Sequence, residues 1–225
     1  MQAGNAHYHS ASELPSTVPV FPLPGALLLP GGQMPLNIFE PRYLQMVDDA
    51  MRGDRIIAMC QPRFDVYDSG NNDAPLCDVG CLGRITSLGE TGDGRYVLTL
   101  QGICRFRVVQ ELAVTTPYRQ ISFKPFVADL EDDKEDEEEV DREALLTAFR
   151  AYLDANGMEA DWESVSRASN ETLVNALSMM SPYGPAEKQA LLEAPDLKTR
   201  AETLIAITEI NLARDDDENG GTVLQ

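Results

Sequence analysis

The sequence has few of the residues on which common catalytic sites depend. Its 225 residues include only two histidines, His7 and His9, and four lysines. No lysine follows a glycine, so the Gly-Lys-Ser/Thr loop that binds nucleotide phosphates is absent from the sequence. Both histidines lie in a polar N-terminal segment that we expect to be mobile, where acid–base chemistry lacks the necessary positioning. We therefore predict no catalytic residue and no bound cofactor.

Cysteines are also scarce, and four in a chain of this length are too few for a disulfide scaffold. Cys77 and Cys81 are the pair nearest to a metal-ligand spacing. In an extended segment they would lie roughly 13 Å apart, too far for one tetrahedral zinc ion or a disulfide. Only a sharp bend at Gly80 would bring them together. We interpret the cysteines as small apolar core residues and predict no metal site.

Long apolar runs and positive charge are lacking as well. No segment approaches the roughly 20 apolar residues of a membrane span, and residues 1–17 lack the pattern of a signal peptide. We expect a soluble, cytoplasmic chain. Its 37 acidic and 18 basic residues give a net charge of −19, which disfavours nucleic acids and anionic membrane surfaces as partners.

The charge is unevenly distributed and divides the chain into two regions. Residues 1–128 carry 12 acidic and 10 basic residues, whereas residues 129–225 carry 25 and 8. The boundary is a run with nine acids in residues 129–139, which cannot bury enough apolar surface to fold. We predict, in order, a disordered tail (1–17), a β-barrel (18–128), an acidic linker (129–140), a helical bundle (141–214) and a second disordered tail (215–225).

The first region contains short segments rich in β-branched, aromatic or leucine residues, separated by Gly, Pro, Asn or Asp. Alternation along the chain predicts that Phe106 is buried, with Arg105 and Arg107 on the opposite, solvent-facing side. A helix of about 12 residues is expected to begin at Pro41. The expected strands are Val18–Phe21, Ala26–Leu29, Met34–Phe39, Arg55–Gln61, Leu76–Leu88, Arg95–Gln101, Ile103–Gln110 and Tyr118–Phe126.

The second region changes to helical spacing of its apolar residues. Leu145, Leu146, Phe149 and Leu153 form one apolar stripe, which ends at Asn156–Gly157. A second stripe lies between Leu173 and Met180, a third helix begins at Pro185, and a fourth runs from Leu197 to Leu212. We expect these four helices to form a small antiparallel bundle.

Several ordered motifs resemble the N-terminal (substrate-binding) domain of Lon proteases. The resemblance extends over residues 18–212 and is closest to stand-alone bacterial members, without the ATPase and Ser-Lys peptidase modules. It implies an α+β fold, a PUA-like twisted antiparallel β-barrel with one embedded helix followed by a C-terminal helical bundle. The matching segments are Pro19–Gly25, Leu29–Gly32, Pro35–Tyr43, Gly80–Ile85, Asp93–Tyr96, Gly102–Phe106 and Glu187–Glu193.

The resemblance also implies a function, a non-enzymatic module that binds exposed apolar protein segments or a specific protein partner. Strand ends and flexible methionines suit such a surface. Two other functions stay open from the residues, RNA binding by the barrel and an enzyme with an unrecognised site. The candidate protein-binding surface comprises Leu28, Leu29, Pro30, Met34, Pro35, Tyr43 and Met46. These side chains could instead belong to the core.

Overall fold

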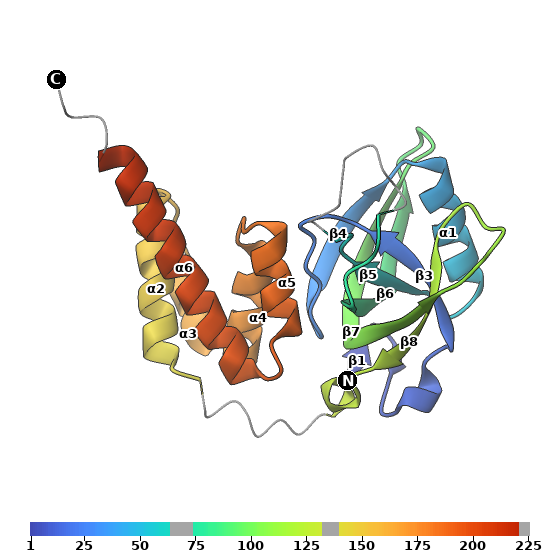
Figure 1. The fold of residues 1–225 in the computed structure, drawn as a ribbon, viewed down its shortest axis with the longest axis horizontal. Helices are drawn as coiled ribbons and strands as arrows, with labels where there is room; N and C mark the ends of the chain where they lie inside the picture. Colours follow the sequence, from blue (N-terminus) through green and yellow to red (C-terminus); the bar gives the residue numbers. More distant parts are fainter. Residues whose placement is uncertain (64–73, 132–139, 221–225) are drawn as a thin grey trace. The chain divides into compact units, whose positions relative to one another are not determined.

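In the computed structural model, which describes residues 1–63, 74–131 and 140–220, the chain forms two units (Figure 1). Unit 1 contains the described residues up to 131 together with residues 182–192. Unit 2 contains the described residues of 140–181 and 193–220. Strands dominate unit 1 and helices form unit 2, and the fold is α+β.

Six strands of unit 1 form one sheet with the order β4-β7-β6-β5-β3-β8. Strand β8 also pairs with β7, so five strands close into a ring, to which β4 is added through β7. The strands are β3 (Thr17–Pro22), β4 (Gln33–Ile38), β5 (Ile56–Cys60), β6 (Val79–Glu90), β7 (Tyr96–Glu111) and β8 (Gln120–Pro125).

The expectation of a purely antiparallel barrel is wrong in one place, because β3 and β5 pair in parallel. The chain between them passes through β4 and the helix α1 (Pro41–Arg52), and this crossover returns it in the original direction. Residues Ala26–Leu29 form no strand, although Leu27, Leu28 and Leu29 are buried. The two strands expected on either side of Gly102 are one continuous strand, β7.

Helix α1 forms as its sequence predicts. Glu40 is the N-cap residue, Pro41 occupies the first turn, and Gly53 ends the helix. Arg42 and Glu40 form an ion pair with a 2.7 Å N–O distance. The helix buries Tyr43, Met46, Val47 and Ala50.

The N-terminal segment is ordered, so the expectation of a mobile tail over residues 1–17 is wrong. It contains β1 (Gln2–Ala3), β2 (Ala6–His7) and the short 3₁₀ helix η1 (Ala11–Glu13). Ala3, Tyr8 and Leu14 belong to the barrel core. The Tyr8 hydroxyl accepts a hydrogen bond from Arg84 (3.1 Å). Isolated apolar residues show no periodicity, yet the segment is held by the core that they fill.

Arg105 is buried rather than solvent-facing. Its main-chain N–H donates to Asp129 Oδ2 (2.8 Å), and its guanidinium donates to both oxygens of the same carboxylate (2.9 and 2.8 Å). Asp129 lies in η2 (Val127–Leu130), so the first residues assigned to the acidic linker belong to unit 1. A buried charge is tolerated only when it is paired in this way. Residues 132–139, the rest of that run, lie outside the described residues.

Helix α5 (Pro185–Glu193) belongs mainly to unit 1, not to the helical bundle as expected. Gln189 donates to the carbonyl of Val79 (3.1 Å) and accepts from Gln61 Nε2 (3.1 Å). Gln61 also accepts from the Gly25 N–H (2.7 Å). These buried amides tie the helix to the barrel through contacts that apolar periodicity cannot reveal.

Unit 2 contains four helices among its described residues. Asp141 and Ser169 cap α2 and α4 by accepting main-chain N–H groups, as helix starts commonly require. Arg200 of α6 donates to Asn175 of α4 in the interior (3.1 Å). The helices are α2 (Arg142–Ala155), α3 (Trp162–Arg167), α4 (Asn170–Met180) and α6 (Leu197–Gly220).

Helix α3 had no counterpart in the sequence-based expectation. Helix α6 continues to Gly220, which contradicts the start of the expected tail (215–225), and residues 221–225 lie outside the described residues. Within the described part of the chain, no helix combines the length and apolar character needed to cross a membrane.

Candidate protein-binding surface

The structure separates the seven residues predicted for a binding surface. Leu28, Leu29 and Pro30 are buried, and so are Tyr43 and Met46 of α1, so these five belong to the core. Met34 is half-buried and Pro35 is exposed, both on β4. The predicted surface therefore does not exist as a whole, and only its β4 part reaches solvent.

The loop before β4 is buried because it packs directly against the main chain of β7. The Gly31 N–H donates to the carbonyl of Gly102 (3.0 Å), and the Gly102 N–H donates to the carbonyl of Gly32 (2.9 Å). A Cβ atom at Gly102 would lie 2.0 Å from the carbonyl oxygen of Leu29. The absence of a side chain at Gly102 is what allows the loop to close over the barrel.

Tyr43 and Met46 face inward from α1. The Tyr43 ring meets Phe21 of β3 edge-on, with 4.3 Å between ring centroids, and the Arg42 guanidinium lies over the Tyr43 ring, 4.4 Å from its centroid. The Met46 side chain has no solvent exposure. These contacts hold the helix against the barrel and leave neither side chain available to a partner.

A different apolar surface lies where β4 meets the first half of β7. Asn37 pairs with Val97 and Pro35 pairs with Thr99, so the three β4–β7 neighbours Pro35, Asn37 and Val97 share one face of the sheet. Val97 is 47% exposed, and Phe39, directly after β4, is 61% exposed. We call Pro35, Phe39 and Val97 the β4–β7 surface.

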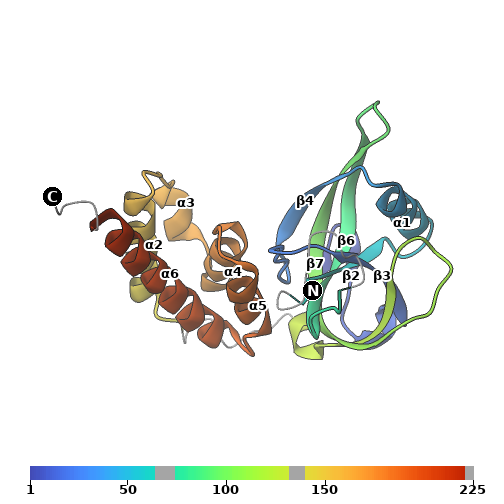
Figure 2. The same ribbon diagram turned by 45° about the horizontal axis from the view of Figure 1, so that its top comes forward.

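Sequence reasoning missed Phe39 and Val97, although a usable signal was present. Alternation within Met34–Phe39 places Pro35 and Phe39 on the side opposite the apolar Met34, Leu36 and Ile38. One side of this strand had to face solvent, and its apolar residues were the better candidates. The continuation of this sheet is the β6–β7 hairpin, which extends past α1 (Figure 2).

The hairpin tip is polar and locally hydrogen-bonded. The Thr91 N–H donates to the carbonyl of Arg95 (3.1 Å), and the Thr91 hydroxyl donates to Asp93. That hydroxyl lowers the pKa of Asp93 below its usual value. The apolar surface therefore stops at the hairpin tip, whose polar and charged side chains are hydrogen-bonded to one another.

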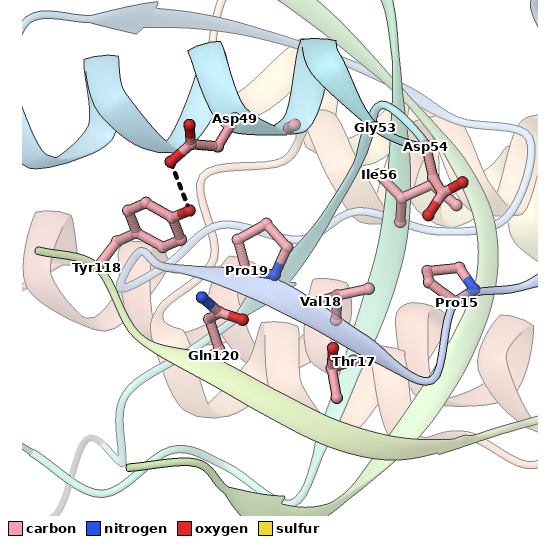
Figure 3. A pocket seen from close by; sticks show the side chains of 11 residues that line it. Pro15, Thr17, Val18, Pro19, Asp49, Gly53, Asp54, Ile56, Tyr118 and Gln120 are labelled. Atoms are coloured by element: carbon pink, nitrogen blue, oxygen red, sulfur yellow. Dashed lines mark hydrogen bonds between the residues drawn. The ribbon is translucent and has the colours of Figure 1, made fainter. Parts of the chain in front are cut away.

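A small pocket opens on another side of unit 1, between β3, β8 and the C-terminal end of α1 (Figure 3). The Tyr118 hydroxyl donates to Asp49 across it (2.8 Å). Burial, followed by this contact with Asp49, raises the pKa of Tyr118 to about 12. The pocket volume of about 160 Å³ is below the roughly 300 Å³ at which small-molecule sites begin. The pocket is too small for such a ligand.

The four cysteines lie in the interior of unit 1 and form no disulfide. Among the residues that the structure describes, no three His, Cys, Asp or Glu side chains gather as a metal site. Burial raises the pKa of Cys104 to about 12, so its thiol stays protonated and poorly nucleophilic at neutral pH. Within the described part of unit 1, the β4–β7 surface is a feature to which a binding function can be attached.

Comparison with known proteins identifies a family over most of the chain. Residues 17–209 match the model of the ATP-dependent protease La (LON) substrate-binding domain. Lon protease 2 of Myxococcus xanthus is 31% identical over 206 residues, which are 87% of this chain and 24% of that protein. Lon protease of Parabacteroides distasonis is 32% identical over 199 residues, which are 85% of this chain and 23% of that protein. The chain thus spans about a quarter of these relatives.

Solved structures show the same fold. A Lon N-terminal domain protein from Xanthomonas campestris aligns with a TM-score of 0.61 and 25% identity, covering 84% of this chain and 97% of that one. The N-terminal domain of the Lon protease from the Mycobacterium avium complex aligns with a TM-score of 0.62 and 18% identity, covering 86% and 98%. The second likeness is one of fold alone.

Proposed function

Because the chain belongs to the LON substrate-binding domain family, we propose that it is a non-enzymatic module that binds exposed apolar segments of other polypeptides. A specific protein partner is the narrower form of the same proposal. The β4–β7 surface is the proposed contact. A cytoplasmic location and the absence of nucleic-acid and membrane partners belong to the proposal as well.

The observation that supports this proposal is the exposure of Pro35 and Val97 on one face of the sheet and of Phe39 directly after β4. Fully burying a side chain such as Phe or Val contributes about 1.5–3 kcal/mol. Two such side chains, each about half exposed or more, are enough to hold an apolar segment with weak affinity. Weak and reversible contact suits a module that meets many sequences.

The charge of the chain narrows the class of partner. The net charge of −19, most of which lies in residues 129–225, disfavours polyanions as partners and favours polypeptides with basic residues. Apolar contact at Phe39 and Val97 then decides how long the partner stays. The proposed ligand is accordingly an unfolded polypeptide, not a nucleic acid.

The proposal is tested by measuring binding to reduced, carbamidomethylated ribonuclease A, a permanently unfolded chain with a positive net charge. The variant Phe39→Ser/Val97→Ser should bind about tenfold more weakly, the loss of roughly 1.4 kcal/mol. Its control is Val109→Ser, because Val109 lies on the same strand and is 65% exposed. The Val109→Ser variant should bind as the unaltered chain does.

Two results would contradict the proposed function. One is an equal loss of binding in the double variant and in Val109→Ser, which would indicate non-specific adhesion. The other is failure of the unaltered chain to bind the unfolded probe while it binds an RNA homopolymer, which would favour the RNA-binding alternative.

A further inference from the structure

Strand β4 has an open edge along its whole length. Strands β7, β6, β5, β3 and β8 form a closed ring of neighbours, in which residues 87–90 of β6, in the hairpin, pair with β7 alone. Among the described residues, β4 pairs with β7 alone. An unpaired edge presents a row of main-chain N–H and C=O groups that another strand can bind.

The register shows which residues of β4 turn those groups outward. The carbonyl of Thr99 on β7 accepts from the hydroxyl of Thr86 on β6 (3.2 Å), so the main chain of Thr99 faces β6. Its partner on β4 is Pro35. Neighbouring pairs alternate between bonded and non-bonded in an antiparallel ladder. The main-chain groups of Gln33, Pro35 and Asn37 therefore point to the open edge.

The identity of Pro35 agrees with this register. Proline has no N–H to donate, and in sheets it is found at edges where the missing donor costs no ladder bond. Gln33, Pro35 and Asn37 are also exposed. The edge offers two N–H donors, from Gln33 and Asn37, and three carbonyl acceptors.

The side chains of β4 specify the kind of strand that fits. The segment Gln33–Ile38 carries no charge, whereas a charged side chain, lysine above all, is a common device that keeps other strands away from an edge. Phe39 and Val97 add exposed apolar area next to the edge. A docking strand of about six uncharged, largely apolar residues would match the edge in length and character.

We propose that β4 is a docking edge, to which an extended apolar segment of a bound polypeptide adds as a further strand, antiparallel or parallel to β4. The inference rests on the proposed function and specifies its mode of recognition. Main-chain hydrogen bonds do not depend on the side chains of the docking strand, so the edge supplies affinity for many segments. The β4–β7 surface then favours the segments that are apolar.

The occupant is a foreign segment, not a second copy of β4. Two copies of β4 paired edge to edge would bring two prolines into one short ladder, with a donor missing on both sides. A partner strand without proline loses only the donor that Pro35 lacks. Pro35 thus weakens self-association more than it weakens binding of other chains.

Amide-resolved hydrogen–deuterium exchange of the full chain, with and without saturating carbamidomethylated ribonuclease A, tests the docking edge. The amides of Gln33 and Asn37 should exchange at least tenfold more slowly in the complex. The exchange rate of the Leu36 amide, which is already directed at β7, should not change.

A second test compares Asn37→Pro with Asn37→Ala, because both lose the side-chain amide and only proline loses the main-chain donor. Asn37→Pro should bind the probe at least tenfold more weakly than Asn37→Ala.

The outcomes separate the two proposals. If the probe binds while Gln33 and Asn37 exchange at unaltered rates, the docking edge is wrong and the proposed function stands. If the probe does not bind at all, both fall. The two amides could also become protected without probe, to a degree that rises with protein concentration. That result would show that a second copy of the chain, and not a foreign segment, occupies the β4 edge.

Discussion

At the scale of single residues, the Arg105–Asp129 pair carries the largest consequence. Both side chains are buried, and three hydrogen bonds join them. Arg105 also donates to the carbonyl of Leu192 on α5 (3.4 Å). Removing the carboxylate would leave a guanidinium without its counter-charge in the interior.

Asp129→Ala should therefore lower the free energy of unfolding by roughly 3–5 kcal/mol, the usual cost of breaking a buried ion pair on one side. The matched control is Asp93→Ala, which removes the partner of Arg95 at the exposed hairpin tip. That variant should leave the stability nearly unchanged, because exposed ion pairs contribute little. Urea denaturation followed by circular dichroism measures both, and similar midpoints for the two variants would refute the prediction.

At the scale of elements, α5 is held by buried polar contacts in addition to the burial of Leu191 and Leu192. Its Gln189 side chain joins Gln61 to the carbonyl of Val79, and Gln61 in turn donates to the carbonyl of Pro185 (3.0 Å). The same Gln61 accepts from Gly25, in the turn that follows β3. One buried glutamine thus connects the helix, β5 and this turn.

Gln189→Leu should cost about 1–3 kcal/mol, because it keeps the size of the side chain and takes the amide donor from a buried carbonyl. Ala190→Gln, on the exposed side of α5, is the control and should change the stability little. Chemical denaturation again provides the measurement. Equal, small effects of the two substitutions would mean that the buried amide network does not hold the helix.

At the scale of the whole molecule, a fall in pH is expected to lower the stability of both units. The pKa of Asp49 in unit 1 is lowered chiefly by a hydrogen bond from Gln45. In unit 2, hydrogen bonds from the Ser164 hydroxyl and the Thr199 main chain lower the pKa of Asp161 and Asp196. Each of these carboxyls is more acidic when folded than when unfolded.

Such groups stabilise the fold above the unfolded pKa of about 4, and the stabilisation is lost as the pH falls through the lower folded pKa. The melting temperature should fall between pH 7 and pH 3. Asp161→Asn should show a smaller fall, because asparagine also caps a helix and does not titrate. A melting temperature that stays constant down to pH 3 would contradict the prediction.

The sequence by itself determined the elements whose signals are local. Helix α1 follows from Glu40, Pro41 and Gly53. The α+β division and the LON family also follow from the order of such local patterns. These local patterns do not predict contacts between residues that are far apart in the chain.

Tertiary structure alone decided the features on which the function depends. Arg105 follows the alternation of an exposed residue, yet it is buried because Asp129, 24 residues later, returns to pair with it. The loop that contains Leu28 and Leu29 has the composition of an exposed apolar binding surface. It belongs to the core because Gly102, which has no side chain, lets this loop pack against β7. Phe39 and the β4 edge are exposed because the ring of strands closes between β7 and β8 and leaves β4 outside it. Closure of a barrel is set by pairings across the whole chain, and no local pattern contains it.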